Sequence, residues 1–231
     1  MMLDFLNYYS KAISLDGERF KNTFPDGSQK SDFLLFEETT ICEFKDLLNF
    51  DVQKRVERVA KKDTRSEQDL KRDLYNTIEN ALSKANKQIK ETKEVLQLPM
   101  ALGLVVIENH IPSDISVLAL MDAANRKMMN GVDNVDGVLC LDFINTFVSA
   151  DGEHIQLAQI VIRDTTRSKD LSNLVGKLME DFSASRNSPL HRNFDVSRAD
   201  QMWAVKPDGQ YGKFSASLSI NNNDDSSQKN R

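Results

Sequence analysis

Residues 32–45 read DFLLFEETTICEFK, and this stretch carries the chemical signal on which the functional prediction depends. It has no helical period, and its aromatic and β-branched residues predict two short strands with a polar connection. Alternate residues of a strand share a face, so Glu43 and Lys45 point the same way. If the turn is centred between residues 37 and 38, Asp32 lies opposite Glu43, with Cβ atoms about 5 Å apart. We therefore predict an antiparallel hairpin that gathers two carboxylates and one ammonium group.

The rest of the sequence predicts strands that alternate with helices. Helical patterns cover residues 1–12, 66–98, 114–129 and 171–182, and strand patterns cover residues 103–107, 138–148 and 154–162. This order predicts an α/β fold with a mixed central β-sheet flanked by helices. We expect one domain over residues 1–184, an extension packed on it over residues 185–215, and a disordered tail over residues 216–231.

Composition restricts the class of protein. Cys42 and Cys140 each lie in an apolar run, which is typical of buried free cysteines and not of a disulfide framework. The sequence shows no export signal and no apolar run long enough to span a membrane, so we expect a cytoplasmic protein without a membrane partner. The formal net charge of -5 argues against a protein that coats nucleic acid through global attraction.

A local run of basic residues, here called the basic track, is compatible with the negative net charge of the chain. Its spacing places four cations along one side of a helix: Lys54, Arg58, Lys61 and Arg65. Two interpretations stay open, a solvated helix face and a track that holds the phosphates of a nucleic-acid strand.

The charges of the hairpin indicate metal chemistry. An unpaired buried charge costs several kcal/mol, so these groups must pair with each other or with a ligand. Two carboxylates, a strand carbonyl and water suit Mg²⁺ or Mn²⁺, and a nearby lysine can orient the attacking water. Motifs for phosphate loops, dinucleotide binding, paired cysteines and serine nucleophiles are absent from the sequence. His110, His154 and His191 are isolated from one another and are interpreted as ordinary loop or strand residues.

The pattern of Asp32, ten intervening residues and then Glu43-Phe44-Lys45 resembles the motif of the PD-(D/E)XK nuclease superfamily. The resemblance implies a restriction-endonuclease-like fold and metal-dependent hydrolysis of DNA phosphodiester bonds. It implies that Asp32 and Glu43 hold the metal and that Lys45 acts on the water. Ser31 stands where the family motif has proline.

A second resemblance lies further along the chain. The helix that carries Gln88 is similar to the Gln-xxx-Tyr helix of the helicase-associated branch of this superfamily, with Thr92 in the place of tyrosine. This resemblance implies that Gln88 joins the catalytic set and steadies Lys45 or a substrate phosphate. The branch also has a glutamate on its first helix, for which Glu18 is the candidate here.

The sequence supports two candidate functions, which belong to different classes of protein. The first is a Mg²⁺-dependent deoxyribonuclease, with RNA left open as a substrate and a homodimer or a larger assembly as the expected state. The alternative is a catalytically inactive nuclease-fold protein that acts as a binding or regulatory module for a protein partner. The intact set of Asp32, Glu43, Lys45 and Gln88 favours the first, because a purely structural protein has no need to direct these groups at one patch.

Overall fold

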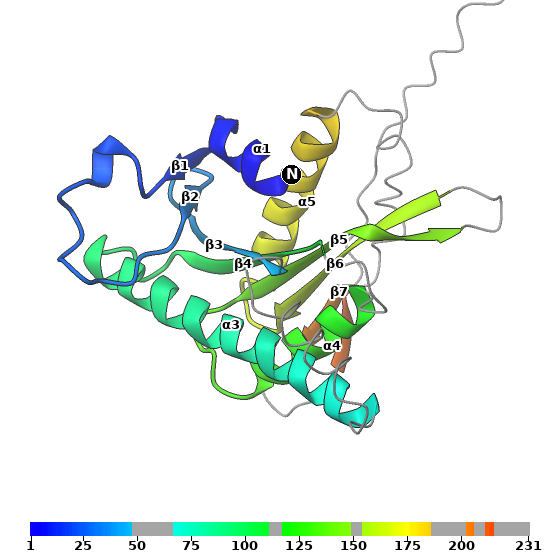
Figure 1. Ribbon diagram of the computed structural model, residues 1–231. Helices are drawn as coiled ribbons and strands as arrows, with labels where there is room; N and C mark the ends of the chain where they lie inside the picture. Colours follow the sequence, from blue (N-terminus) through cyan, green and yellow to red (C-terminus); the bar gives the residue numbers. More distant parts are fainter. Residues whose placement is uncertain (48–66, 111–116, 149–153, 186–201, 206–210, 215–231) are drawn as a thin grey trace, which may run out of the picture.

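One mixed β-sheet organises the protein (Figure 1). The computed structural model describes residues 1–47, 67–110, 117–148, 154–185, 202–205 and 211–214. The eight strands that it describes follow chain order across the sheet: β1 Ala12–Ser14, β2 Phe33–Leu35, β3 Thr40–Asp46, β4 Leu102–Asn109, β5 Gly137–Val148, β6 His154–Arg163, β7 Met202–Val205 and β8 Tyr211–Phe214. The β3–β4, β4–β5 and β6–β7 pairs are parallel, and the other neighbouring pairs are antiparallel.

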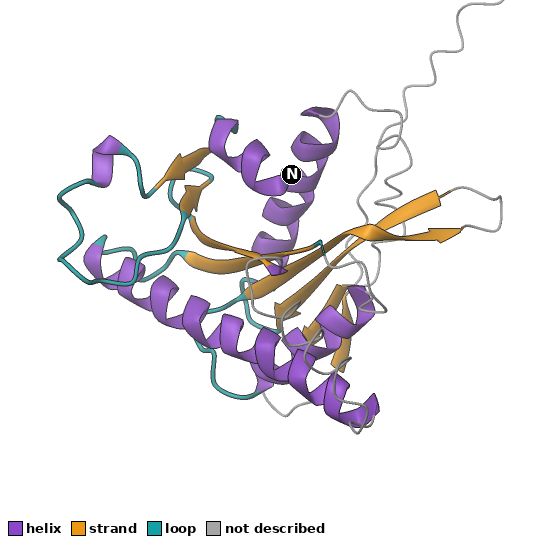
Figure 2. Ribbon diagram, in the orientation of Figure 1, coloured by secondary structure: helices purple, strands orange, loops and turns teal. Residues whose placement is uncertain are grey.

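Helices cover both faces of this sheet (Figure 2). They are α1 Met2–Tyr8, α3 Glu67–Val95, α4 Val117–Met129 and α5 Ser168–Ser185, and a short 3-10 helix, η1 Glu18–Phe20, lies in the connection between β1 and β2. Buried side chains of α3 and α4 pack on one face, and those of α1 and α5 pack on the other. The predicted α/β fold with a mixed sheet flanked by helices is therefore confirmed.

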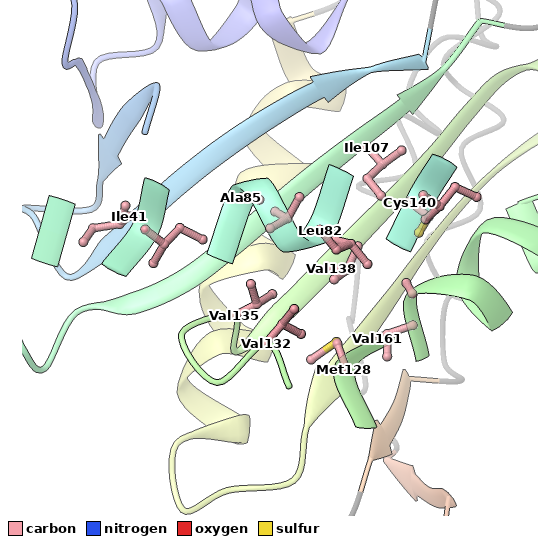
Figure 3. Packing of buried hydrophobic residues seen from close by; sticks show 14 of the residues in the cluster. Ile41, Leu82, Ala85, Ile107, Met128, Val132, Val135, Val138, Cys140 and Val161 are labelled. Carbon is pink, nitrogen blue, oxygen red and sulfur yellow. The ribbon is translucent and has the colours of Figure 1, made fainter. Parts of the chain in front are cut away.

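The core under α3 explains why the sequence adopts this order. Leu82 and Ala85 of α3 meet Ile107 of β4 and Val138 of β5, and all four are fully buried (Figure 3). Every residue of β4 is buried, as expected for a strand with parallel neighbours on both sides and helices on both faces.

Gly103 allows a close approach at the start of β4. A Cβ atom at this position would lie 1.9 Å from the carbonyl oxygen of Asn134. The neighbouring loop is held there by two bonds, because the Gly103 amide donates to Asp136 Oδ2 at 2.7 Å and the Asp136 amide donates to the Gly103 carbonyl at 2.8 Å. The glycine is required for this crossing of loop and strand.

Some elements differ from the sequence-based expectation. The first helix ends at Tyr8, and residues 12–14 form strand β1 instead of continuing the helix. Strands β7 and β8 extend the sheet beyond β6, whereas the sequence pattern indicated no strand in this region. The predicted tail over residues 216–231 lies outside the described residues. Within the described part of the chain, no helix has the length and apolar character needed to cross a membrane.

Candidate functional site

The β2–β3 hairpin directs three charged residues toward α3. Phe33 pairs with Cys42, so the next position outward brings Asp32 opposite Glu43, and the Asp32 amide donates to the Cys42 carbonyl at 3.3 Å. Leu34 and Ile41 of the same hairpin belong to the core under α3. Since strand residues alternate between faces, Asp32, Glu43 and Lys45 share that face.

The turn of this hairpin is unusual in composition. Phe36, Glu37 and Glu38 have φ angles of 51°, 57° and 67°, which is the left-handed region that glycine and asparagine favour. The Thr39 amide and hydroxyl both donate to the Phe36 carbonyl, at 3.2 and 2.8 Å, and close the turn. The turn thus sets the register that opposes Asp32 and Glu43.

Glu43 is the buried centre of the site. Its residue is 1% exposed, and Lys45 Nζ donates to its Oε1 atom. Its other oxygen, Oε2, is buried and accepts no hydrogen bond from any residue that the structure describes. A buried carboxylate oxygen without a donor is costly, and a bound cation is one partner that would offset this cost.

Asp32 is fixed by the opposite strand. Its Oδ2 atom accepts a hydrogen bond of 2.7 Å from the Phe44 amide. Burial raises the pKa of Asp32, even though this amide and the Lys45 ammonium act to lower it. The carboxyl group is therefore held in place while its negative charge remains incompletely compensated.

The two carboxyl groups also oppose each other electrostatically. Burial, and then repulsion by Asp32, raise the pKa of Glu43 to about 7, although Lys45 acts in the opposite direction. One ammonium group thus does not balance two buried carboxylates, and the site is short of positive charge.

A divalent cation fits this deficit. Asp32 and Glu43 supply hard carboxylate oxygens, and the unpaired Glu43 Oε2 atom is a direct candidate ligand. The described residues contain no group of three or more His, Cys, Asp or Glu side chains arranged around one metal position. A cation here would consequently take its remaining ligands from backbone carbonyls, water and substrate phosphate, which is the usual pattern for Mg²⁺.

Gln88 of α3 connects the site to the helix. Its Oε1 atom accepts from Lys45 Nζ at 3.1 Å, and its Nε2 atom donates to the Lys30 carbonyl at 2.9 Å. Both ends of the amide are engaged within the protein. The structure therefore brings Gln88 together with Asp32, Glu43 and Lys45, in a position that steadies Lys45.

Two neighbours of Gln88 on α3 hold the same segment: Glu91, which sequence reasoning missed, and Thr92, which the resemblance had placed in the tyrosine position without assigning it a contact. Glu91 Oε2 accepts from the Gln29 amide at 2.6 Å, and Thr92 Oγ1 accepts from the Ser31 amide at 2.9 Å. Gln88, Glu91 and Thr92, here called the α3 clamp, thus bind three consecutive residues that precede Asp32. Their spacing of three and four residues, which places side chains on one helix face, was the available signal.

Other predicted residues have different surroundings. Glu18 lies on η1 and not on the first helix, and its exposed carboxylate pairs with Lys21 at 3.3 Å instead of with a site residue. The basic track of Lys54, Arg58, Lys61 and Arg65 lies outside the described residues, as does His191. His110 pairs with the buried Glu108 at 2.7 Å, and both cysteines are buried and free.

Comparisons with protein-family models, with curated proteins and with solved structures found no match to this chain.

Proposed function

We propose that the protein is a metal-dependent nuclease that hydrolyses phosphodiester bonds of DNA on a restriction-endonuclease-like fold. The observation that carries the proposal is the Glu43 Oε2 atom, which is buried and lacks a donor among the described residues while Asp32 and Lys45 adjoin it. A carboxylate pair with one lysine suits phosphoryl chemistry, because each group has a separate role there.

In the proposed mechanism, Asp32 and Glu43 hold Mg²⁺ or Mn²⁺. The bound cation supplies charge neutralisation at the phosphate and acidifies water. Lys45 Nζ donates hydrogen bonds and places a positive charge beside the attacking water and the phosphate oxygens. Gln88 keeps the ammonium group of Lys45 directed at the site through their 3.1 Å contact.

Substrate binding is assigned to local charge, since the chain is acidic overall. The predicted track of Lys54, Arg58, Lys61 and Arg65 precedes α3 in sequence, and α3 carries Gln88. We assign phosphate contacts of the DNA strand to this track. Cutting both strands of a duplex requires two sites, so a homodimer or a larger assembly, acting in the cytoplasm, belongs to the same proposal.

Cleavage of single- and double-stranded DNA in Mg²⁺ or Mn²⁺ tests the proposal, with RNA as a parallel substrate. Glu43→Ala and Lys45→Ala should each abolish cutting while the proteins stay folded by circular dichroism. Glu94→Ala and Lys90→Ala are matched controls, because these residues are exposed on α3 and pair with each other at 3.8 Å. Cleavage that survives in both site variants would assign the activity to another site or to a contaminant.

The second candidate function is the inactive binding or regulatory module, and a different surface favours it. A groove of about 700 Å³ lies between α1 and α5, on the face of the sheet opposite to α3. It is lined by Phe5, Tyr9 and Phe182 and by Tyr8, which is 91% exposed. The absence of both cleavage and metal binding in solution would support this second function over the first.

A further inference from the structure

The segment that precedes Asp32 has few structural constraints of its own. Strand β2 begins only at Phe33, so the backbone of residues 29–31 lies outside the sheet ladder. Asp32 itself is bonded to Cys42 and Leu15 through its backbone, whereas the direction in which the chain enters Asp32 depends on what holds residues 29–31 from the side.

The α3 clamp provides that support at three consecutive residues. Glu91 accepts from the amide of residue 29, Gln88 donates to the carbonyl of residue 30, and Thr92 accepts from the amide of residue 31, at 2.6, 2.9 and 2.9 Å. The Thr92 contact is the buried one, because Thr92 is 0% exposed and Ser31 is 2% exposed. A buried hydrogen bond in a dry environment restrains its partners more than an exposed one.

We propose that Thr92 is a positioning residue for Asp32, which acts through its hydrogen bond to the Ser31 amide and thereby sets the geometry of the metal site. Thr92 is fully buried and its bond goes to the Ser31 amide, so we assign it an indirect effect on the site. The inference rests on the proposed function, because it assigns Asp32 the task of holding the cation. Residues that orient metal ligands in this way typically change metal affinity by roughly tenfold to a hundredfold when they are lost.

Thr92→Val and Thr92→Ser separate the hydrogen bond from the packing. Valine keeps the shape of threonine but removes the acceptor, whereas serine keeps the acceptor and removes a methyl group. Hydrogen exchange of the peptide that contains residues 29–32, followed by mass spectrometry, reports the local restraint directly. Thr92→Val should speed this exchange roughly tenfold, which is the scale of one lost buried hydrogen bond, and Thr92→Ser should resemble the native protein.

Metal binding and kinetics give two further readouts. Calorimetry with Mg²⁺ alone and Mn²⁺ alone should show affinity at least about tenfold weaker in Thr92→Val and near-native affinity in Thr92→Ser. On DNA, kcat should fall by a similar factor, whereas KM for DNA should change little, because Thr92 contacts no substrate. Ile78→Val is the stability control, since it shortens a buried side chain of the same helix about 21 Å away along its axis.

Several outcomes would overturn the proposal. The first is hydrogen exchange of residues 29–32 and metal affinity that both stay native in Thr92→Val. The second is a loss of metal affinity in Thr92→Ser or in Ile78→Val that equals the loss in Thr92→Val. If Thr92→Val does not fold, Thr92→Ala compared with Thr92→Ser tests the same bond, because the two variants differ only in the hydroxyl group, and equal exchange of residues 29–32 in both would overturn the proposal. If the native protein neither binds metal nor cuts DNA, the proposed function fails, and the exchange experiment still decides whether Thr92 fixes the segment.

Discussion

Glu43 is the site residue whose ionised form burial disfavours most clearly. It is nearly inaccessible to solvent, it faces a second carboxyl group, and its ion pair with Lys45 does not bring its pKa back to the usual range. A cation that binds there must therefore displace a proton from part of the population near neutral pH. Asp32 differs because a backbone amide already fixes one of its oxygens.

The first prediction concerns the pH dependence of stability in metal-free protein. The folded pKa of Glu43, about 7, lies above its ordinary value of 4.5, so the folded state binds the proton more tightly. Proton binding by Glu43 therefore contributes to the free energy of unfolding. This contribution is complete below pH 4.5 and is lost as the pH rises through about 7. Glu43→Gln mimics the protonated side chain and should exceed the native protein in free energy of unfolding by roughly 3 kcal/mol at about pH 8, with little difference at about pH 4.5.

Urea unfolding with a chelator present, repeated across this pH range, measures the effect. Glu94→Gln is the control, because the Glu94 side chain is 65% exposed. A difference between native protein and Glu43→Gln that does not vary with pH would contradict the assigned pKa shift.

The second prediction separates the charge of Asp32 from its hydrogen bond. Asp32→Asn keeps an oxygen that can accept from the Phe44 amide, but it removes one negative charge from the site. Mg²⁺ affinity should fall roughly tenfold or more, because ligand charge tunes affinity, while the melting temperature without metal should not decrease. Calorimetry and thermal unfolding measure both quantities, with the exposed Asp170→Asn as control. Unchanged Mg²⁺ affinity would contradict the proposed role of Asp32 as a metal ligand.

At the scale of elements, the sequence predicted the long periodic helix and the hairpin that has a recognisable partner strand, and it missed the isolated short strands. The helical period identified α3, and the alternation around residues 32–45 identified the β2–β3 hairpin and the opposition of its two carboxylates. Strands β1, β7 and β8 contain three or four residues each, which is too short for a period to appear. The left-handed turn at residues 36–38 had no glycine or asparagine to reveal it.

The third prediction belongs to the packing of β4. Gly103→Ala places a Cβ atom against the backbone carbonyl of Asn134, so strand or loop must move, and both are tied by the Asp136 bonds. Overpacking of this kind should destabilise the protein by about 1–3 kcal/mol or more. Gly131→Ala is the comparison, because its φ of 87° carries a backbone penalty but no atom lies near its added methyl group. Urea unfolding should give Gly103→Ala a lower free energy of unfolding than Gly131→Ala. The reverse order would contradict the close approach of Gly103 to the Asn134 carbonyl.

At the scale of the whole molecule, the sheet separates two surfaces with different chemistry. The α3 side holds the carboxylate pair, whereas the α1 and α5 side holds the aromatic groove. The alternation of elements predicted a mixed sheet, but the pairing of β7 with β6 depends on contacts between distant segments that no local pattern encodes. The site was predictable where it depends on strand register, and the resemblance indicated Gln88, but the bonds of the α3 clamp to residues 29–31 were not predictable, because they depend on how a helix docks beside a loop.

The fourth prediction concerns nucleic-acid binding by an acidic chain. If the basic track contacts phosphates, replacing both Arg58 and Arg65 with alanine should weaken DNA binding on all sequences and reduce the salt slope of log affinity by about 2. Fluorescence anisotropy across a series of salt concentrations measures this slope. Lys90→Ala with Lys127→Ala removes equal charge elsewhere and serves as the control. Equal slopes in the two double variants would show that the track makes no specific phosphate contact.

The sequence separation of the residues that form the site affects the order in which its contacts form during folding. The Asp32 contact with the Phe44 amide joins residues 12 apart, whereas the Thr92 contact with the Ser31 amide joins residues 61 apart. Closing the longer loop requires a formed and docked α3, and its greater entropic cost delays it during folding. We therefore expect the two carboxylates to meet before the bond from Thr92 to the Ser31 amide forms. A cation that binds only the finished site accordingly slows unfolding and leaves the refolding rate nearly unchanged.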